Sequence, residues 1–159
     1  MEMGVDKNKI LIIPNATDIE RFSTISRERA KEKTGIYTNK KDILFVGGLE
    51  EVKNLRKLIR AYSSSEELRE KSTLHLVGDG REKESLMKLV NDLSLNGRIF
   101  FHGSKKFEDM HYYYRSADIF VLPSKTEITP RVIIEAMASN LPIVATKVGD
   151  VERIINNSI

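Results

Sequence analysis

Six apolar runs, each of strand length, recur along the chain, and longer helix-like segments separate them. The runs cover residues 9–13, 43–46, 73–77, 99–101, 119–122 and 143–145. They are almost continuously hydrophobic, which is typical of strands buried on both faces of a parallel sheet. The alternation predicts an α/β fold, a Rossmann-like doubly wound parallel sheet of about six strands with helices on both faces.

The intervening segments carry helix signals. Apolar residues at helical spacing and flanking turn residues predict helices over residues 24–33, 54–62, 81–93, 107–115, 131–138 and 150–155. Gly35 is placed to end the first of these helices. Ser63 and Glu66 have capping-box spacing, which predicts a fresh helical turn after a break. Residues 14–23 fit neither pattern and are expected to form a linker or irregular arm.

Length and composition narrow the class of protein. A chain of 159 residues is expected to form one domain with a substantial core. The absence of cysteine excludes disulfides and thiolate chemistry and fits a reducing compartment. No apolar run approaches the roughly 20 residues of a membrane span, and the polar N-terminus is unlike a signal peptide. We expect a soluble, cytoplasmic protein.

The charge balance favours small anionic ligands. Lysine and arginine number 26 against 23 acidic residues, a net charge of +3, and the signs are mixed along the chain. This modest excess suits phosphate groups or an acidic membrane face, but it is too weak to predict nucleic-acid binding.

Glycines follow two of the predicted strands. Gly47 and Gly48 permit close backbone approach to a ligand, and Lys53 at the next helix start can reach a diphosphate. A plain glycine turn with a surface lysine is the alternative, and the spacing alone favours it. The Gly-Asp-Gly at residues 78–80 is better explained as a structural turn, because it lacks the full dinucleotide fingerprint.

A third strand-end loop contains His102 and Gly103. Gly103 permits a planar base to lie against the backbone, although a turn capped by Ser104 explains the pattern equally well. His102 and the other two histidines lack metal-ligand spacing and have no cysteine to support them, so we expect no metal site.

The fourth loop carries two glutamates eight positions apart, Glu127 and Glu135. Pro130 suits the first turn of the following helix, where the amides of Arg131 and Val132 are available to a phosphate. Glu135, about one turn further on, is placed to accept hydrogen bonds from two ribose hydroxyls, and Glu127 lies where a sugar would sit. Two solvated glutamates flanking a loop are an equal alternative on spacing alone.

Taken in order, these segments resemble the C-terminal, donor-binding domain of the GT-B fold retaining glycosyltransferases of family 4, the glycosyl transferases group 1. The resemblance covers nearly the whole chain. Each segment is weak by itself, but the ordered series is specific. The segments are IIPN at 12–15, FVGGL at 45–49 with Lys53 and Asn54, LVGDG at 76–80, FFHG at 100–103, ADIFVLPS at 117–124, Glu127 with EAMA at 135–138, and PIVAT at 142–146.

The resemblance implies roles for these residues. Lys53 and Glu127 are the implied catalytic residues: Lys53 contacts the donor diphosphate and Glu127 the transferred sugar. Glu135 binds the ribose. The remaining implied donor-binding residues are Gly47, Gly48, His102, Gly103, Ile128, Thr129, Pro130, Arg131 and Val132, with His102 and Gly103 near the base.

The implied reaction is metal-independent transfer of a hexose from a UDP- or GDP-linked sugar to a saccharide or lipid-linked acceptor, with retention at the anomeric carbon and without a cofactor. The chain has no Asp-x-Asp motif, so backbone amides and Lys53 are expected to neutralise the diphosphate. Peripheral membrane contact at the inner face is implied for the full-length enzyme.

Two departures from the family pattern concern the donor. The family commonly has arginine where this chain has Gly48, and glycine where it has Ile128. The first change removes a positive charge beside the leaving diphosphate. The second places a branched side chain, which resists positive φ, beside Glu127, where it is expected to crowd the sugar site.

The domain expectation follows from the same resemblance. Residues 1–159 are expected to form one nucleotide-sugar-binding domain, with residues 1–23 as an incoming strand and arm, and the acceptor-binding N-terminal domain lies outside this chain. The isolated chain is then expected to be inactive. The alternative is a non-catalytic Rossmann-like module that acts through protein–protein contacts. A flavodoxin-like or receiver domain ranks lower, since the acidic cluster expected at its first strand ends is missing.

Overall fold

The centre of the protein is a five-stranded, fully parallel sheet with the strand order β3-β2-β1-β4-β5. The computed structural model describes residues 7–11 and 13–156. The strands are β1 (Lys41–Val46), β2 (Ser72–Val77), β3 (Ile99–Gly103), β4 (Ile119–Leu122) and β5 (Ile143–Ala145). Five of the six predicted strands are therefore confirmed, and so is the doubly wound α/β class.

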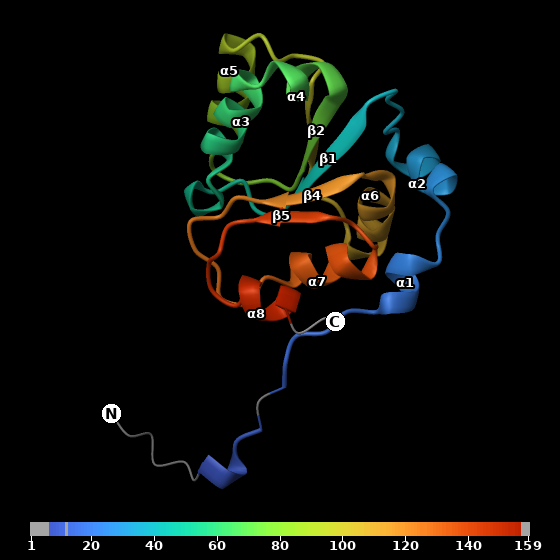
Figure 1. The fold of residues 1–159 in the computed structure, drawn as a ribbon, viewed down its shortest axis with the longest axis vertical. Helices are drawn as coiled ribbons and strands as arrows, with labels where there is room; N and C mark the ends of the chain where they lie inside the picture. The colour runs from blue at the N-terminus through green and yellow to red at the C-terminus, as the bar shows by residue number, and fades with distance from the viewer. Residues whose placement is uncertain (1–6, 12, 157–159) are drawn as a thin grey trace.

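The sixth predicted strand, at residues 9–13, is wrong. Lys9 ends the short 3-10 helix η1 (Lys7–Lys9), residues 10, 11 and 13 have no regular structure, and Ile12 lies outside the described residues. Leu11 and Ile13 are 82% and 78% exposed. The described residues 7–11 and 13–17 extend away from the sheet (Figure 1). An apolar run forms a strand only where a neighbouring strand accepts its hydrogen bonds.

Helices cover both faces of the sheet (Figure 1). On one side lie α3, α4 and α5, and on the other lie α1, α2, α6 and α7, with α8 packed beside α7. Their bounds are α1 (Ile19–Ser23), α2 (Arg27–Thr34), α3 (Leu55–Ser64), α4 (Glu66–Lys71), α5 (Lys83–Asp92), α6 (Met110–Ser116), α7 (Arg131–Ala138) and α8 (Val151–Asn156). Two further 3-10 turns, η2 (Glu51–Lys53) and η3 (Phe107–Asp109), precede α3 and α6.

Capping residues set several helix ends. Gly35 ends α2 in the left-handed region at φ 70°, as predicted. The predicted capping box at Ser63 and Glu66 is wrong, because the side chain of Ser65 caps α4 by accepting from the Leu68 amide. The expectation of an irregular arm over residues 14–23 is wrong in its second half, where Asp18 caps α1.

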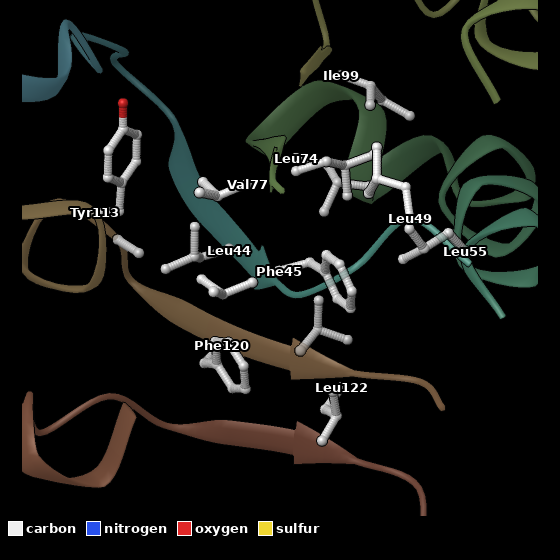
Figure 2. Close-up of a cluster of buried hydrophobic side chains, with 14 of the residues drawn as sticks. Leu44, Phe45, Leu49, Leu55, Leu74, Val77, Ile99, Tyr113, Phe120 and Leu122 are labelled. Carbon is white, nitrogen blue, oxygen red and sulfur yellow. The ribbon is translucent and has the colours of Figure 1, made fainter. Parts of the chain in front are cut away.

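The core fills both faces of the central strands. Leu44 on β1 is paired in register with Phe120 on β4, and both side chains are fully buried. Figure 2 shows Phe45, Leu49 and Leu55 gathered near the end of β1, where all three are inaccessible to solvent. These contacts fix the position of the loop that leaves β1.

The strand order reverses between β1 and β4, since the chain runs outward from β1 to β3 and then returns to the other side of β1. In open α/β sheets, the crevice beyond the carboxyl ends of the two strands at such a reversal is where ligands bind. The loops that follow β1 and β4 are therefore the first place to look for a functional site.

The loop after β1 also packs closely against the loop after β2, which predicts a contrast between two glycine substitutions. An added Cβ at Gly78, which has φ 138°, would collide with the Gly47 carbonyl oxygen. At Gly48 the Cβ would meet Glu50 Cγ at an ordinary 3.6 Å. Gly78→Ala should lower the free energy of unfolding by about 2 kcal/mol or more, and Gly48→Ala by much less. Urea unfolding of both variants measures this, and equal losses would contradict the packing.

Candidate functional site

The loops that follow β1 and β4 are joined by backbone and side-chain hydrogen bonds. The Lys125 amide donates to the Val52 carbonyl at 2.8 Å, and Asn54 Nδ2 donates to the Pro123 carbonyl at 3.2 Å. Asn54 adopts the left-handed conformation at φ 57°, which asparagine tolerates better than most residues. These hydrogen bonds hold Lys53, the residue before Asn54, close to the loop that follows β4.

Lys53 and Glu127 meet in this crevice. Lys53 Nζ lies 2.6 Å from Glu127 Oε1, and the side chains are only 22% and 11% exposed. Ser124 Oγ donates to the same carboxylate oxygen at 2.6 Å. An ammonium group has three donors, so Lys53 can retain this ion pair and still donate to an anion. The structure thus brings together the two residues predicted as catalytic, from loops 74 positions apart.

Residues near the C-terminal end of the chain contact the segment that follows Glu127. The Asp150 amide donates to the Ile128 carbonyl at 2.9 Å, and Thr129 Oγ1 donates to Asp150 Oδ2 at 2.9 Å. Gly149, at φ 53°, passes so close to the Glu127 carbonyl that a Cβ there would collide with it. The loop between β4 and α7 is therefore braced by the segment between β5 and α8.

Ile128 has the backbone conformation expected of a branched residue, and its expected crowding of the sugar site stays a prediction. Its φ is not positive, and its side chain is 88% exposed. A branched side chain can occupy this position because the backbone stays in the ordinary region and the side chain extends into solvent.

The helix α7 begins at Arg131, after Pro130. Pro130 takes the cap position with no side-chain hydrogen bond, so no side chain occupies the amides of the first turn, including those of Arg131 and Val132. Arg131 also lies over the Phe107 ring, with its guanidinium carbon 5.8 Å from the ring centroid. The start of α7 therefore has the geometry that the anion-site prediction requires, and its contact with a phosphate stays a prediction.

Glu135 lies on the buried face of α7. The residue is 6% exposed, and its Oε2 accepts a 2.8 Å hydrogen bond from the hydroxyl of Tyr114 on α6. Burial, reinforced by the adjacent carboxylate, raises the pKa of Tyr114 well above its usual range, so this hydroxyl keeps its proton. Glu135 thus contacts Tyr114, not Lys53 or Glu127.

The prediction that His102 and Gly103 lie in a loop is wrong, because both belong to the end of β3. His102 belongs to a chain of hydrogen bonds that joins side chains of β3, β2 and β1. Its Nε2 lies 2.9 Å from His75 Nδ1, and His75 Nε2 lies 3.2 Å from Asp42 Oδ1. Tyr113 packs edge-on against the His102 ring at 5.3 Å. His75, which is 3% exposed within β2, therefore has a structural role. Ser104, the alternative cap, is exposed and is not the N-cap of η3, which is Lys106.

A cavity of about 240 Å³ opens between the carboxyl ends of β1, β2 and β3. Gly47 and Gly48 line one side, and Ser104 and Lys105, which follow Gly103, line another. Larger cavities lie elsewhere, and two of them measure about 500 and 520 Å³. The first lies beside the residue 15–23 segment and α7, and the second lies around Lys40 and Lys71. We place the functional site at the strand ends because the paired charges and glycine loops converge there.

Three contributors have no predicted role. Ser124 and Asn54 belong to segments that carry the family resemblance, but their spacing indicates no partner. Tyr114 has the local pattern of a packing residue, and nothing in that pattern reveals a partner 21 positions away. In the described part of the chain, no cluster of three or more histidine, cysteine or acidic side chains is arranged to hold a metal ion. Among the described helices, none has the length and apolarity to cross a bilayer.

Comparison with known proteins agrees with this geometry. The sequence profile of the family described as glycosyl transferases group 1 matches residues 26–159. This chain belongs to that family. It is 29% identical over 147 residues to a D-inositol 3-phosphate glycosyltransferase from Mycolicibacterium smegmatis, covering 92% of this chain and 34% of that protein.

Two solved structures illustrate the shared fold. WaaG, a glycosyltransferase involved in lipopolysaccharide biosynthesis, superposes with a TM-score of 0.79 at 23% identity, covering 96% of this chain and 42% of WaaG. HepE from Anabaena, solved with UDP-glucose, gives a TM-score of 0.77 at 25% identity, covering 95% and 42%. The fold is therefore that of the Rossmann-like C-terminal domain of GT-B glycosyltransferases. The chain spans about a third of the length of the curated relatives that it matches.

The environment of His102 predicts how stability depends on pH. Burial, with smaller contributions from His75 and Lys105, lowers the pKa of His102 from 6.5 to about 4. Between these values the unfolded chain binds a proton at this residue and the folded chain does not, so the free energy of unfolding falls as the pH drops from 6.5 towards 4.

Urea unfolding of the wild type and His102→Gln at pH 7 and pH 5 tests this. The glutamine variant does not titrate, so it should lose less stability between the two pH values. An identical loss in both proteins would show that His102 is not buried in its neutral form.

Proposed function

We propose that this chain is the donor-binding half of a retaining glycosyltransferase that transfers a hexose from a UDP- or GDP-linked sugar to a saccharide or lipid-linked acceptor. The observation that carries the proposal is the Lys53–Glu127 pair, which is held at 2.6 Å in the crevice where the strand order reverses. Family membership and the binding of UDP-glucose by the structurally similar HepE support it.

In this proposal each group meets one part of the donor. Lys53 and the first amides of α7 face the diphosphate, and Glu127 accepts hydrogen bonds from the transferred sugar. Glu135 receives the ribose hydroxyls, and the end of β3 at His102 and Gly103 lies beside the base. Protein groups supply the positive charge, so the transfer proceeds without a metal or cofactor.

The pairing of Lys53 with Glu127 defines the chemistry available. When the bond between the anomeric carbon and the diphosphate breaks, negative charge develops on the leaving group, and Lys53 is already positioned to stabilise it. The acceptor hydroxyl forms the new bond on the same face of the sugar, and its proton leaves with the diphosphate. Glu127 positions the sugar and keeps the lysine oriented in the meantime.

Transfer also requires an acceptor held against the donor, because catalysis depends on the two reactants being oriented together. We propose that a second, N-terminal domain outside this chain supplies that surface, consistent with the chain's length relative to its relatives. The isolated chain then binds donor and shows little or no transferase activity. In the full-length enzyme we place the reaction in the cytoplasm, with peripheral contact at the inner membrane face.

A second candidate function, a non-catalytic module that binds a partner protein, is favoured by one observation. Gly48 leaves the diphosphate side without the arginine expected from the family, and the charge of Lys53 is already matched by Glu127. This candidate predicts no nucleotide binding and a stable complex with another chain. Size-exclusion chromatography with light scattering, together with a nucleotide titration, separates the two functions.

Nucleotide binding should be visible as thermal stabilisation. UDP or GDP at a hundredfold excess over its Kd should raise the Tm by roughly 5 to 10 °C. Lys53→Ala should abolish the shift, while Lys57→Ala, which removes an exposed lysine from α3, should retain it. No shift with either nucleotide or any nucleotide sugar would overturn the proposal, and equal shifts in both variants would remove Lys53 from the site.

Restoring the missing charge should strengthen binding. Gly48 has an ordinary φ, and an added Cβ meets no close neighbour, so the backbone admits a side chain there. Gly48→Arg should bind UDP or GDP about tenfold more tightly than the wild type, because a guanidinium beside the diphosphate adds a charge-assisted hydrogen bond. Calorimetric titration measures the change, with Gly48→Gln as the uncharged control. An equal gain in both variants would argue against a phosphate contact.

A further inference from the structure

The hydrogen bond between Tyr114 and Glu135 joins two buried side chains from different helices. Tyr114 on α6 is fully inaccessible, and its hydroxyl lies 2.8 Å from Glu135 Oε2. An ionised carboxylate can only accept hydrogen bonds, so the tyrosine is the donor. The hydrogen bond from Tyr114 occupies one carboxylate oxygen and leaves the other, Oε1, as the acceptor available to a ligand.

The ring of Tyr114 cannot easily turn away from this contact. Phe22 from α1 packs against it at 5.6 Å with an interplanar angle of 70°, and Phe120 from β4 packs at 5.6 Å with an angle of 39°. Phe22 and Phe120 are both fully buried. The hydroxyl is therefore held in place by aromatic packing from two other elements, and it fixes the direction of the Glu135 carboxylate before any ligand arrives.

We infer that Tyr114 is a positioning residue that orients Glu135 toward the 2′- and 3′-hydroxyls of a ribose, and so lets the site distinguish a ribonucleotide from its 2′-deoxy counterpart. The inference rests on the proposed function and deepens it, because it concerns the ligand of the same site. A carboxylate of fixed direction can accept hydrogen bonds from both ribose hydroxyls. When a ligand lacks one hydroxyl, one of these hydrogen bonds is lost and an acceptor is left unpaired, which discriminates strongly between the two ligands.

A purely structural role is the competing explanation, since buried tyrosines commonly satisfy their hydroxyl groups. Tyr62 provides a matched control. It is 1% exposed and donates a 2.7 Å hydrogen bond to the Ser72 carbonyl, but it belongs to α3 on the opposite side of the sheet. Tyr62→Phe therefore removes a comparable buried hydrogen bond without touching Glu135.

The experiment compares calorimetric affinities for UDP and 2′-deoxy-UDP, or for GDP and 2′-deoxy-GDP if the wild type binds guanosine more tightly. Tyr114→Phe should weaken ribonucleotide binding roughly tenfold or more, with little change for the 2′-deoxy form, so the ratio between the two affinities shrinks. Tyr62→Phe should leave that ratio unchanged.

The outcomes distinguish failure of the proposed function from failure of this inference. A wild type that binds none of these nucleotides overturns the proposed function and this inference together. A wild type that binds nucleotide but does not prefer ribose, or a Tyr114→Phe variant with an unaltered ratio, overturns the inference alone.

If Tyr114→Phe proves too unstable to titrate, Glu135→Gln provides a second route, since its amide oxygen can still accept from Tyr114. This variant should lower the ribose preference while keeping its Tm near that of the wild type. An unchanged preference would overturn the inference.

Discussion

The parallel pairing of β1 with β4 is the constraint on which the rest of the structure depends. Ile43 and Leu44 lie in register with Ile119 and Phe120. At the start of the pair, the Asp118 amide donates to the Asp42 carbonyl at 2.8 Å, and the Asp42 amide donates to Asp118 Oδ2 at 2.9 Å. This junction joins the two halves of the sheet, so the loops beyond both strands reach the same crevice.

The charges in that crevice are matched before any ligand binds. Lys53, Glu127 and Ser124 form a closed hydrogen-bonded group in a partly buried position, where electrostatic interactions are stronger than in water. Such a group lowers the reorganisation needed when a charged ligand enters. Glu135 is prepared in a different way, by a neutral donor in an aromatic setting. The two glutamates of one loop-helix segment therefore have unlike environments, which suits contacts with different parts of one ligand.

The hydrophobic pattern predicted strands correctly where both faces of the strand are buried, because burial on both faces makes the apolar run continuous. The runs at residues 43–46 and 119–122 are strands because they occupy the middle of the sheet. The equally apolar run at residues 9–13 has no strand beside it in the described chain, so hydrophobicity alone misidentified it. The cap of α4 was misplaced for a similar reason: Ser65 is the cap rather than Ser63, because α3 continues to Ser64, two residues beyond its predicted end.

The sequence by itself determined most of the sheet-forming runs, the helices between them and the candidate site residues Lys53, Glu127 and Glu135. Only the tertiary structure decided that Lys53 pairs with Glu127, that Tyr114 holds Glu135, and that Ile128 extends into solvent. The reason is physical. Periodicity records which side of an element is buried, whereas partners many positions apart are chosen by strand order and helix packing.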